Sequence, residues 1–499
     1  MAPWFFGRRR KRAAARWDMA APLIRWSDQG DVYDTRSSFS GTMCFGASGA
    51  GKTSGPGRML AHAFLQAGYG ACVLTCRPGD TDDWLDYAKA AGREGDVVLF
   101  GPGHGHVYDV LDDELQQAGG DAAMVENIVA LLSALGEVGR RGLSGGGQES
   151  EPYWRAAGNQ LSRNVISLLA LAEGRVSIPA IYKAVTSAPT SFEQLKSEEW
   201  RKQSFCYRML QQADQKERTP EQDADFRLVT DYFLQEIPGL SDKTRSVILS
   251  TLTSLIDQLN RGVLRSLFSG RTTTTPRAVE GGAILILDIP IKRYGTIGQL
   301  GQVLFKQAFM RSIERRRIDD DTRPVALWAD EAQFFLAEGE DFLFATTCRG
   351  ARVANVMLTQ SLPSIVAALG AGEQGRAQAA SLVANFATKV FCAQADAETN
   401  QFAAGLIGRS RQYLSSGNSS RSSQDWMDAF LGMGGNEQQS GGFQEGWEYE
   451  FQPHAFSDLR TGGPDNDWEI DAIVFRNGKR FAAGGKSWLK VTFKQDAGK

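Results

Sequence analysis

Apolar and polar positions alternate in two ways along the first part of the chain. Short apolar runs, expected to be strands, occupy residues 42–45, 71–75 and 97–100. Between them, apolar residues recur with helical spacing over residues 59–67 and 84–91. Strands that alternate with helices indicate a parallel sheet whose strands are connected by crossover helices.

The pattern becomes almost entirely helical from residue 112 to residue 267. One expected helix has a single apolar stripe through Trp154, Ala157, Leu161, Val165 and Leu168. Strand-like runs then return at residues 283–287, 325–328, 353–358 and 389–392. Because an ordinary loop is never this long, the pattern predicts one α/β domain that carries a large all-α insertion.

The last part of the chain combines a polar stretch with two alternating runs. Residues 409–445 are rich in Ser, Gly and Gln and have little periodicity, which predicts a flexible polar linker. Residues 468–475 and 488–493 alternate, and Asn477-Gly478 is a dipeptide typical of tight hairpin turns. We therefore expect a C-terminal β-hairpin that packs on the main sheet.

Composition sets limits rather than a function. Hydrophobic residues are 42% and charged residues 23% of the 499, as in an ordinary globular protein. No run of 18 apolar residues occurs, so no transmembrane segment is expected. Six cysteines without a Cys-x-x-Cys pair indicate buried thiols in a reducing compartment. With a net charge of −3, any surface for nucleic acid must be local.

One local basic cluster lies at the N-terminus. Aromatic residues at positions 4–6 precede basic residues at positions 8–12. Such a segment either contacts anionic lipid or nucleic acid, or remains a solvated arm. The sequence leaves both interpretations open.

The strand expected at residues 42–45 leads directly into a phosphate-binding loop. Residues 46–53 fit the pattern G-x-x-x-x-G-K-[ST]. Glycines let backbone N–H groups point at phosphate oxygens, Lys52 brings a positive charge to the outer phosphates, and the Thr53 hydroxyl is a ligand for Mg²⁺. The predicted cofactors are ATP and Mg²⁺. The predicted nucleotide contacts are Gly46, Ala47, Ser48, Gly49, Ala50, Gly51, Lys52, Thr53 and Ser54.

Two adjacent acids end the strand expected at residues 325–328. Asp330 is positioned to hold Mg²⁺, and Glu331 to polarise the attacking water. Two neighbouring carboxylates repel each other unless a cation or a polar task stabilises them. The alternative is an exposed, solvated Asp-Glu turn.

Further catalytic candidates surround the next strand. Gln360 follows it and has an amide that could contact the γ-phosphate or position water, while Arg349 and Arg352 precede it. An arginine there could reach the γ-phosphate of a neighbouring subunit as an arginine finger. The alternative is a strand end and a loop whose polar side chains are solvated.

Together these motifs resemble the type IV secretion coupling proteins, the TraG/TraD-like ATPases of conjugative DNA transfer, within the FtsK–HerA group of RecA-like motors. The resemblance covers most of residues 40–495. Its motifs lie at residues 46–53, 73–80, 153–154, 285–290, 330–331, 349–350, 359–361 and 385–390. It implies a hexameric ring that hydrolyses ATP between subunits, a helical insertion that recruits cargo, and an arginine finger at Arg349 rather than Arg352.

The chain departs from this family in two respects. Most members begin with transmembrane helices, and none is expected here. The family's Asp-Pro-Lys-Gly-Glu motif after the second strand is replaced by residues 75–80, in which Arg77 keeps the charge of lysine without its shape. The expected location is the cytoplasm, either free or peripheral at the inner face of a bacterial membrane.

The predicted fold is an α/β, RecA-like P-loop NTPase domain with a mostly parallel sheet, a large all-α insertion and a C-terminal β-hairpin. The expected segments are an N-terminal arm (1–39), a nucleotide-binding domain in two parts (40–111 and 276–408), the insertion (112–275), a polar linker (409–450) and a C-terminal β segment (451–499).

The predicted function is an ATP-hydrolysing ring motor, a homo-oligomer that translocates DNA or a nucleoprotein by sequence-tolerant contacts to phosphates. Expected partners are a relaxase or effector protein as cargo and a separate membrane-anchored subunit. Two alternatives remain: an adaptor ATPase that recruits effector proteins to a secretion machine, and a motor subunit of a DNA-defence or mobile-element complex.

Overall fold

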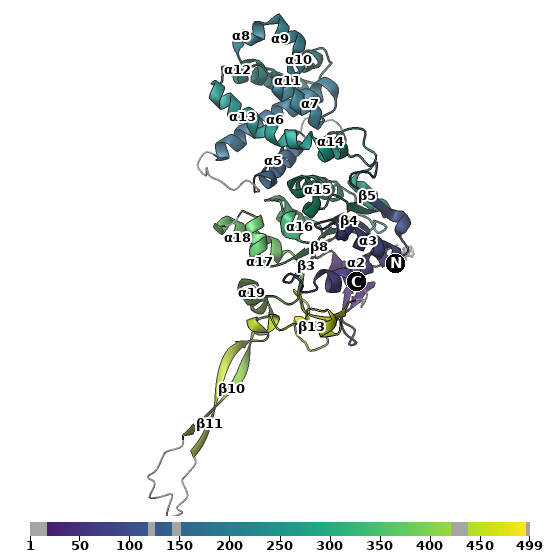
Figure 1. Cartoon of the computed structure of the whole chain (residues 1–499), viewed down its shortest axis with the longest axis vertical. Coiled ribbons are helices and arrows are strands. Elements are labelled where there is room, and N and C mark those ends of the chain that lie inside the picture. Colours follow the sequence, from purple (N-terminus) through teal and green to yellow (C-terminus); the bar gives the residue numbers. More distant parts are fainter. Residues whose placement is uncertain (1–16, 118–124, 142–150, 371, 421–437, 496–499) are drawn as a thin grey trace, which may run out of the picture.

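A nine-stranded sheet lies at the centre of the computed structural model, which describes residues 17–117, 125–141, 151–370, 372–420 and 438–495 (Figure 1). From edge to edge its strands are β13 (Trp488–Lys494), β12 (Glu469–Arg476), β9 (Thr388–Phe391), β3 (Thr42–Phe45), β8 (Val353–Thr359), β7 (Val325–Ala329), β4 (Gly70–Leu74), β6 (Ile284–Leu287) and β5 (Val97–Phe100). The strands from β9 to β5 pair in parallel, whereas β12 and β13 join antiparallel.

This sheet confirms the predicted fold class. Each strand expected from the sequence lies within about a residue of its predicted position, because fully buried strands are nearly continuous apolar runs. All of the residues of β3, β4, β6, β7 and β8 are buried. The carboxyl ends of the parallel strands share one edge of the sheet, where ligands of open α/β sheets bind.

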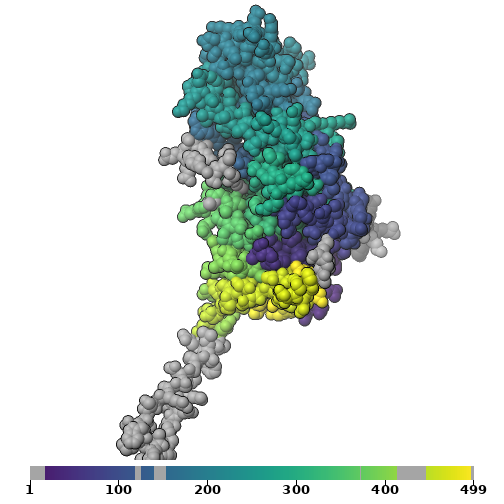
Figure 2. Space-filling view, in the orientation of Figure 1, coloured from purple at the N-terminus to yellow at the C-terminus, as the bar shows by residue number. Residues whose placement is uncertain are grey.

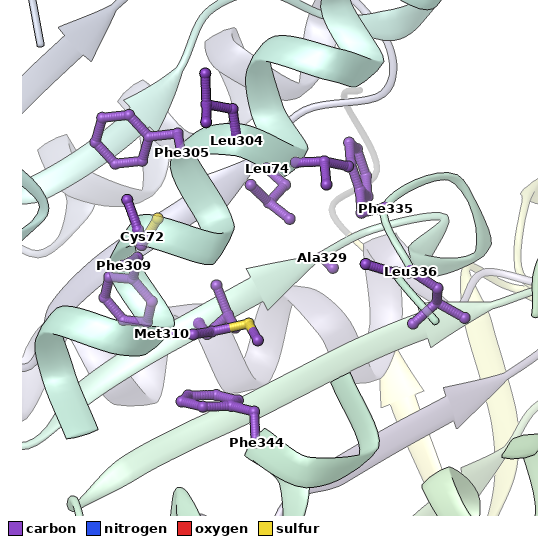
Figure 3. Packing of buried hydrophobic residues seen from close by; sticks show 14 of the residues in the cluster. Cys72, Leu74, Leu304, Phe305, Phe309, Met310, Ala329, Phe335, Leu336 and Phe344 are labelled. Carbon is purple, nitrogen blue, oxygen red and sulfur yellow. The ribbon is translucent and has the colours of Figure 1, made fainter. Parts of the chain in front are cut away.

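Helices cover the sheet on both sides. They are α2 (Arg58–Gln66), α3 (Gly79–Ala90), α15 (Ile291–Glu314), α16 (Glu340–Thr347), α17 (Leu362–Ala368), α18 (Gly372–Ala384) and α19 (Ala397–Ile407). Helix α15 is the most deeply buried: Phe305 and Phe309 are fully buried and lie beside Cys72 of β4 (Figure 3). Burying each of these rings contributes roughly 2 kcal/mol.

Every described element between β5 and residue 275 is helical. The helices are α4 (Val110–Gln117), α5 (Val125–Arg141), α6 (Glu151–Glu173), α7 (Ile178–Thr186), α8 (Phe192–Lys196), α9 (Glu198–Gln203), α10 (Phe205–Asp214), α11 (Pro220–Asp231), α12 (Ile237–Gly239), α13 (Asp242–Leu259) and α14 (Gly262–Phe268). Figure 1 shows that they stack on one end of the α/β domain.

Local sequence signals explain where many of these helices begin. Six of them follow a Ser or Thr whose hydroxyl accepts a hydrogen bond from the backbone N–H three residues further on. The capping residues are Ser177, Ser191, Ser197, Ser204, Thr219 and Ser241. Since every described element between β5 and residue 275 is helical, the predicted all-α insertion is present.

Within the described residues, no individual helix has both the length and the apolar character needed to cross a membrane. Residues Tyr153–Glu173 and Ile178–Thr186 reach that length and composition only when taken together, across a bend of 111°.

The segment before β3 is structured from residue 17 onward. The sequence placed it in an N-terminal arm, but β1 (Pro22–Arg25) and β2 (Val32–Asp34) form a small antiparallel sheet, followed by α1 (Thr35–Ser38). The Trp26 ring packs edge-on against Phe493 of β13, so this segment is part of the domain. The basic cluster at positions 8–12 lies outside the described residues.

The polar stretch predicted to be a flexible linker contains two paired strands, which corrects that prediction. Strands β10 (Arg409–Ser420) and β11 (Gln438–Tyr449) form an antiparallel ribbon that projects from the body (Figure 1). Strand pairing uses main-chain groups, whereas the alternation sought in the sequence appears only when one face is buried. A projecting ribbon lacks that signal.

The C-terminal hairpin is confirmed, but its tight turn is wrong. Strands β12 and β13 are joined by residues 477–487 instead of a two-residue turn at Asn477-Gly478. The longer loop folds back onto the β1–β2 sheet, where Phe481 is buried and the Ala482 N–H donates to the Asp31 carboxylate over 2.7 Å. These contacts replace the tight turn that the dipeptide favours.

Candidate nucleotide-binding site

The phosphate loop follows β3 and is held between the ends of two neighbouring strands. The Gly46 N–H donates to the Thr359 carbonyl over 3.2 Å, and the Ala47 N–H donates to the Ala393 carbonyl over 3.0 Å. Gly51 has a φ of 76°, and a Cβ at that position would come within 2.4 Å of the Ile470 side chain. The positive φ favours glycine, and any larger residue there would also have to displace the Ile470 side chain.

Lys52 lies at the end of this loop and is paired with the second acid of β7. Its Nζ is 2.8 Å from Oε1 of Glu331, and only 6% of its surface is exposed. Burial acts to raise the pKa of Glu331, but the Lys52 hydrogen bond and charge outweigh it and lower that pKa. Glu331 is therefore a carboxylate at neutral pH. Its backbone adopts a left-handed φ of 53°, unusual for a residue other than glycine.

Thr53 and Asp330 form a second pair beside the first. The Thr53 hydroxyl donates to Oδ2 of Asp330 over 2.7 Å, and the Glu331 N–H donates to Oδ1 of the same carboxylate over 2.8 Å. Burial raises the pKa of Asp330 to about 6, although Lys52 and Thr53 act to lower it. A buried carboxylate with an excess affinity for positive charge, next to a hydroxyl, fits Mg²⁺, which prefers oxygen ligands.

Two glutamines orient the Glu331 carboxylate. Gln333 Nε2 donates to Oε2 of Glu331 over 2.7 Å, and the Thr359 hydroxyl donates to Oε1 of Gln333 over 2.9 Å. Gln360, at the end of β8, also hydrogen-bonds the Glu331 side chain. The sequence motifs indicate Gln360 but not Gln333, whose only signal is that it is a polar residue two positions after the acid pair.

Neither arginine before β8 lies near the phosphate loop of the same chain. Arg352 is held by its own loop, since its guanidinium donates to the Thr322 carbonyl over 3.0 Å. Arg349 is exposed and precedes β8, whereas the phosphate loop and Gln360 lie where β3 and β8 end. The seven residues of β8 place the two groups about 20 Å apart.

A cavity of about 560 Å³ adjoins the phosphate loop. Its wall contains residues that the sequence analysis did not assign: Arg58, His62, Arg77, Asp83, Asp86, Tyr87, Ala90, Trp468 and Gln495. Arg77 brings a guanidinium nitrogen to 3.7 Å from the Asp330 carboxylate and is held by Asp80 at 3.1 Å. Within the described residues, no cluster of three or more His, Cys, Asp or Glu side chains could hold a metal ion. A site with one carboxylate and one hydroxyl matches Mg²⁺, which usually keeps several waters and phosphate oxygens as ligands.

The fold and the loop define a RecA-like P-loop protein, and comparison with known proteins places it more narrowly. Residues 324–444 match the protein family described as "TraM recognition site of TraD and TraG". No curated protein sequence matches the chain.

Solved structures of conjugative coupling proteins share the fold over nearly the whole chain. The bacterial conjugative coupling protein TrwBdeltaN70 is 14% identical with a TM-score of 0.53, covering 93% of this chain and 87% of that one. The plasmid coupling protein TrwB in complex with ADP and Mg²⁺ is 15% identical with a TM-score of 0.52, covering 96% and 91%. The resemblance to TraG/TraD-like coupling proteins is thus confirmed.

Proposed function

We propose that this protein is an ATP-hydrolysing motor of the coupling-protein kind, which works as a ring of identical subunits and moves DNA or a nucleoprotein. The observation that carries the proposal is the double pairing of Lys52 with Glu331 and of Thr53 with Asp330. This pairing supports a site in which a phosphate loop, a metal ligand and an ionised carboxylate act together. The TrwB structures with ADP and Mg²⁺ and with an ATP analogue support ATP and Mg²⁺ as its ligands.

Binding of nucleotide would break the ion pair between Lys52 and Glu331. A triphosphate in the loop offers Lys52 a stronger partner than Glu331, so the ammonium turns to the outer phosphates. The freed Glu331 carboxylate then accepts a hydrogen bond from the attacking water, oriented by Gln333 and Gln360. Thr53 and Asp330 would hold Mg²⁺, which would supply positive charge to the phosphate oxygens.

The catalytic cation of the site comes from a second copy. Arg349 is exposed on the edge of the sheet opposite its own phosphate loop, so it can complete only a neighbour's site. An arginine of this kind stabilises the charge of the transition state. This geometry supports a closed ring, which we propose is a hexamer, with DNA phosphates as sequence-tolerant contacts in its centre.

ATP hydrolysis with and without DNA tests this proposal. We expect DNA to stimulate hydrolysis, the stimulation to fall with salt, and Glu331→Gln to lose about 10²–10⁴-fold in rate while it still binds ATP. Glu94→Gln, an exposed acid far from the site, is the matched control. Lys52→Ala should lose ATP binding. Unchanged ATP affinity in Lys52→Ala would show that the site assignment is wrong.

The family match favours a second candidate, an adaptor that recruits a protein. Residues 324–444 match a family described by recognition of a protein, TraM, in TraD and TraG. Hydrolysis that ignores DNA but responds to a protein bound by this segment would favour the adaptor over the motor. Either function fits a cytoplasmic protein, free or peripheral at a membrane with a separate anchored subunit.

A further inference from the structure

We infer that the C-terminal segment supplies the base-binding half of the nucleotide site, with the Trp468 indole as the surface on which a purine stacks. The inference rests on the proposed function, since it presupposes that a nucleoside triphosphate occupies the phosphate loop. It assigns Trp468 and Gln495, which lie more than 400 residues beyond that loop in the sequence, to substrate binding.

The C-terminal segment touches the phosphate loop directly. Gln495 Nε2 donates to the Ser54 hydroxyl over 2.6 Å, and Ile470 and the Thr461 carbonyl lie against Gly51. In the space-filling view the C-terminal segment, yellow, lies against the purple segment that carries the loop (Figure 2). The loop and this segment are therefore one structural unit.

The position of the contact matches the base rather than the reacting phosphate. In a phosphate loop the lysine reaches the outer phosphates, and the backbone of the loop surrounds the inner ones. Lys52 points at Glu331, whereas Ser54, two residues on, meets Gln495. The side of the loop near Ser54 is thus where the ribose and the base leave the α-phosphate.

The backbone of Trp468 is held at that place by two main-chain hydrogen bonds. Its N–H donates to the Gly463 carbonyl over 2.8 Å, and its carbonyl accepts from the Gln495 N–H over 2.8 Å. The Gln495 side chain closes the loop by accepting from the Gly463 N–H over 2.8 Å. Asp467 and Trp468 both have left-handed φ values, 53° and 59°. Adjacent residues in this conformation cost free energy and persist where surrounding contacts impose them, commonly at ligand sites.

The cavity leaves room for a base beside the indole. Trp468 is half-buried and lines the same 560 Å³ cavity as the phosphate loop, within the range for small-molecule sites. The wall of this cavity also includes Tyr87 and His62, whose ring centroids are 4.8 Å apart. An indole recognises the face of a base and not its edge, so ATP and GTP should bind alike, and a pyrimidine triphosphate more weakly because it offers less stacking area.

Calorimetric titration of the full chain with ATP and with inorganic tripolyphosphate, both with Mg²⁺, tests the inference. Tripolyphosphate fills the phosphate loop without a base. We expect Trp468→Ala to weaken ATP binding about tenfold or more and to leave tripolyphosphate binding within about twofold. Trp468→Phe should restore most of the ATP affinity, and Lys52→Ala should weaken both ligands. Trp447→Ala, which removes an exposed tryptophan from β11, is the matched control.

The outcomes separate this inference from the proposed function. Unchanged ATP affinity in Trp468→Ala, or an equal loss for ATP and tripolyphosphate, overturns the stacking role but does not contradict the assignment of the phosphate loop as a nucleotide site. A wild-type chain that binds neither ligand overturns the proposed function as well. Thermal unfolding of each variant identifies misfolding. If Trp468→Ala does not fold, Trp468→Phe takes its place. It should keep most of the wild-type preference for ATP over tripolyphosphate, and loss of that preference overturns the inference.

Discussion

Charged residues have different partners at the two ends of the parallel strands: the carboxyl edge, where the strands end, and the amino edge, where they begin. At the carboxyl edge, Lys52 is buried and paired with Glu331 at 2.8 Å. Near the amino edge, Lys389 of β9 is equally buried, but its Nζ donates to the Phe386 carbonyl, and Arg349 stands exposed. Burial lowers the pKa of Lys389 to about 8. Lys52 is thus paired with a carboxylate of its own chain, whereas the Lys389 ammonium is bound by a backbone carbonyl.

This difference indicates how a site can be divided between subunits. The paired Lys52 and Glu331 lie in the proposed nucleotide site, whereas Arg349 is exposed at the opposite edge and can contact another subunit. If one copy presents Arg349 to the phosphate loop of the next, each interface contains one complete site.

Removal of Arg349 should have the largest effect on a catalytic site that is shared between two subunits. We expect Arg349→Ala to lower the hydrolysis rate about 10³-fold, because the transition state loses its cation, with little change in ATP affinity. Steady-state hydrolysis and ATP titration measure the two effects. Arg352→Ala, the matched control, should mainly lower stability, since its guanidinium binds its own loop.

Mixing variants separates a contribution across the interface from one within the chain. Arg349→Ala and Glu331→Gln subunits, each inactive alone, should recover partial hydrolysis when combined. A mixture that stays inactive at every ratio, although mixed rings form, contradicts a site shared between copies.

The buried ion pair behind the carboxyl edge should carry the largest effect on stability. Lys306 of α15 lies 2.6 Å from Asp341, both nearly fully buried, and donates to the Phe335 carbonyl over 2.6 Å. Lys306→Met leaves an unpaired buried carboxylate, so we expect a loss of about 3–5 kcal/mol in the free energy of unfolding. Chemical denaturation measures it. The double variant Lys306→Met with Asp341→Leu should recover much of that loss, and a single variant that costs under about 1 kcal/mol refutes the expectation.

Gln333 tests whether the ends of β7 and β8 act as one unit. Because Gln333 bridges Glu331 and Thr359, we expect Gln333→Ala to lower hydrolysis about tenfold, the value of one hydrogen bond to a charged group. ATP affinity should stay unchanged. Gln374→Ala, on the exposed surface of α18, is the control; equal rates in the two variants would remove Gln333 from the mechanism.

Lys389 should have a smaller effect on stability than the Lys306–Asp341 pair, and a distinct pH dependence. Its pKa is about 8 in the folded protein and 10.5 in the unfolded chain, so the folded state binds fewer protons between these values. Stability attributable to Lys389 therefore rises as the pH increases from about 8 to 10.5. Below pH 8 the buried charge costs its full penalty of about 3 kcal/mol. Lys389→Met removes this penalty but also loses the hydrogen bond to the Phe386 carbonyl, so it should stabilise the protein by about 2 kcal/mol there.

Thermal unfolding of Lys389→Met and wild type from pH 7 to pH 10.5 measures this effect. The difference in Tm should narrow as the pH rises. Lys243→Met, an exposed lysine on α13, should change little at any pH. A constant difference across the range would show that the lysine is not the titrating group.

Sequence patterns predicted the central sheet well because its signals are local. A buried parallel strand is an apolar run wherever it occurs, so the runs at β3, β7 and β8 required no tertiary information. Signals that depend on tertiary context gave a wrong prediction. The Asn477-Gly478 dipeptide by itself favours a tight turn, but contacts with the β1–β2 sheet accompany a longer loop in the structure. The ribbon of β10 and β11 escaped notice because no buried face imposes alternation on it.

The sequence by itself determined the order of strands and helices, the glycine-rich loop with Lys52 and Thr53, and the acid pair after β7, since each depends on neighbouring residues along the chain. Only the tertiary structure decided which side chains meet. It brings Glu331 to Lys52 across 279 positions, places Gln495 on Ser54 across 441, and puts Arg349 on the far edge of the sheet. The physical reason is that the order of the strands across the sheet, unlike their order along the chain, results from the packing of the whole chain.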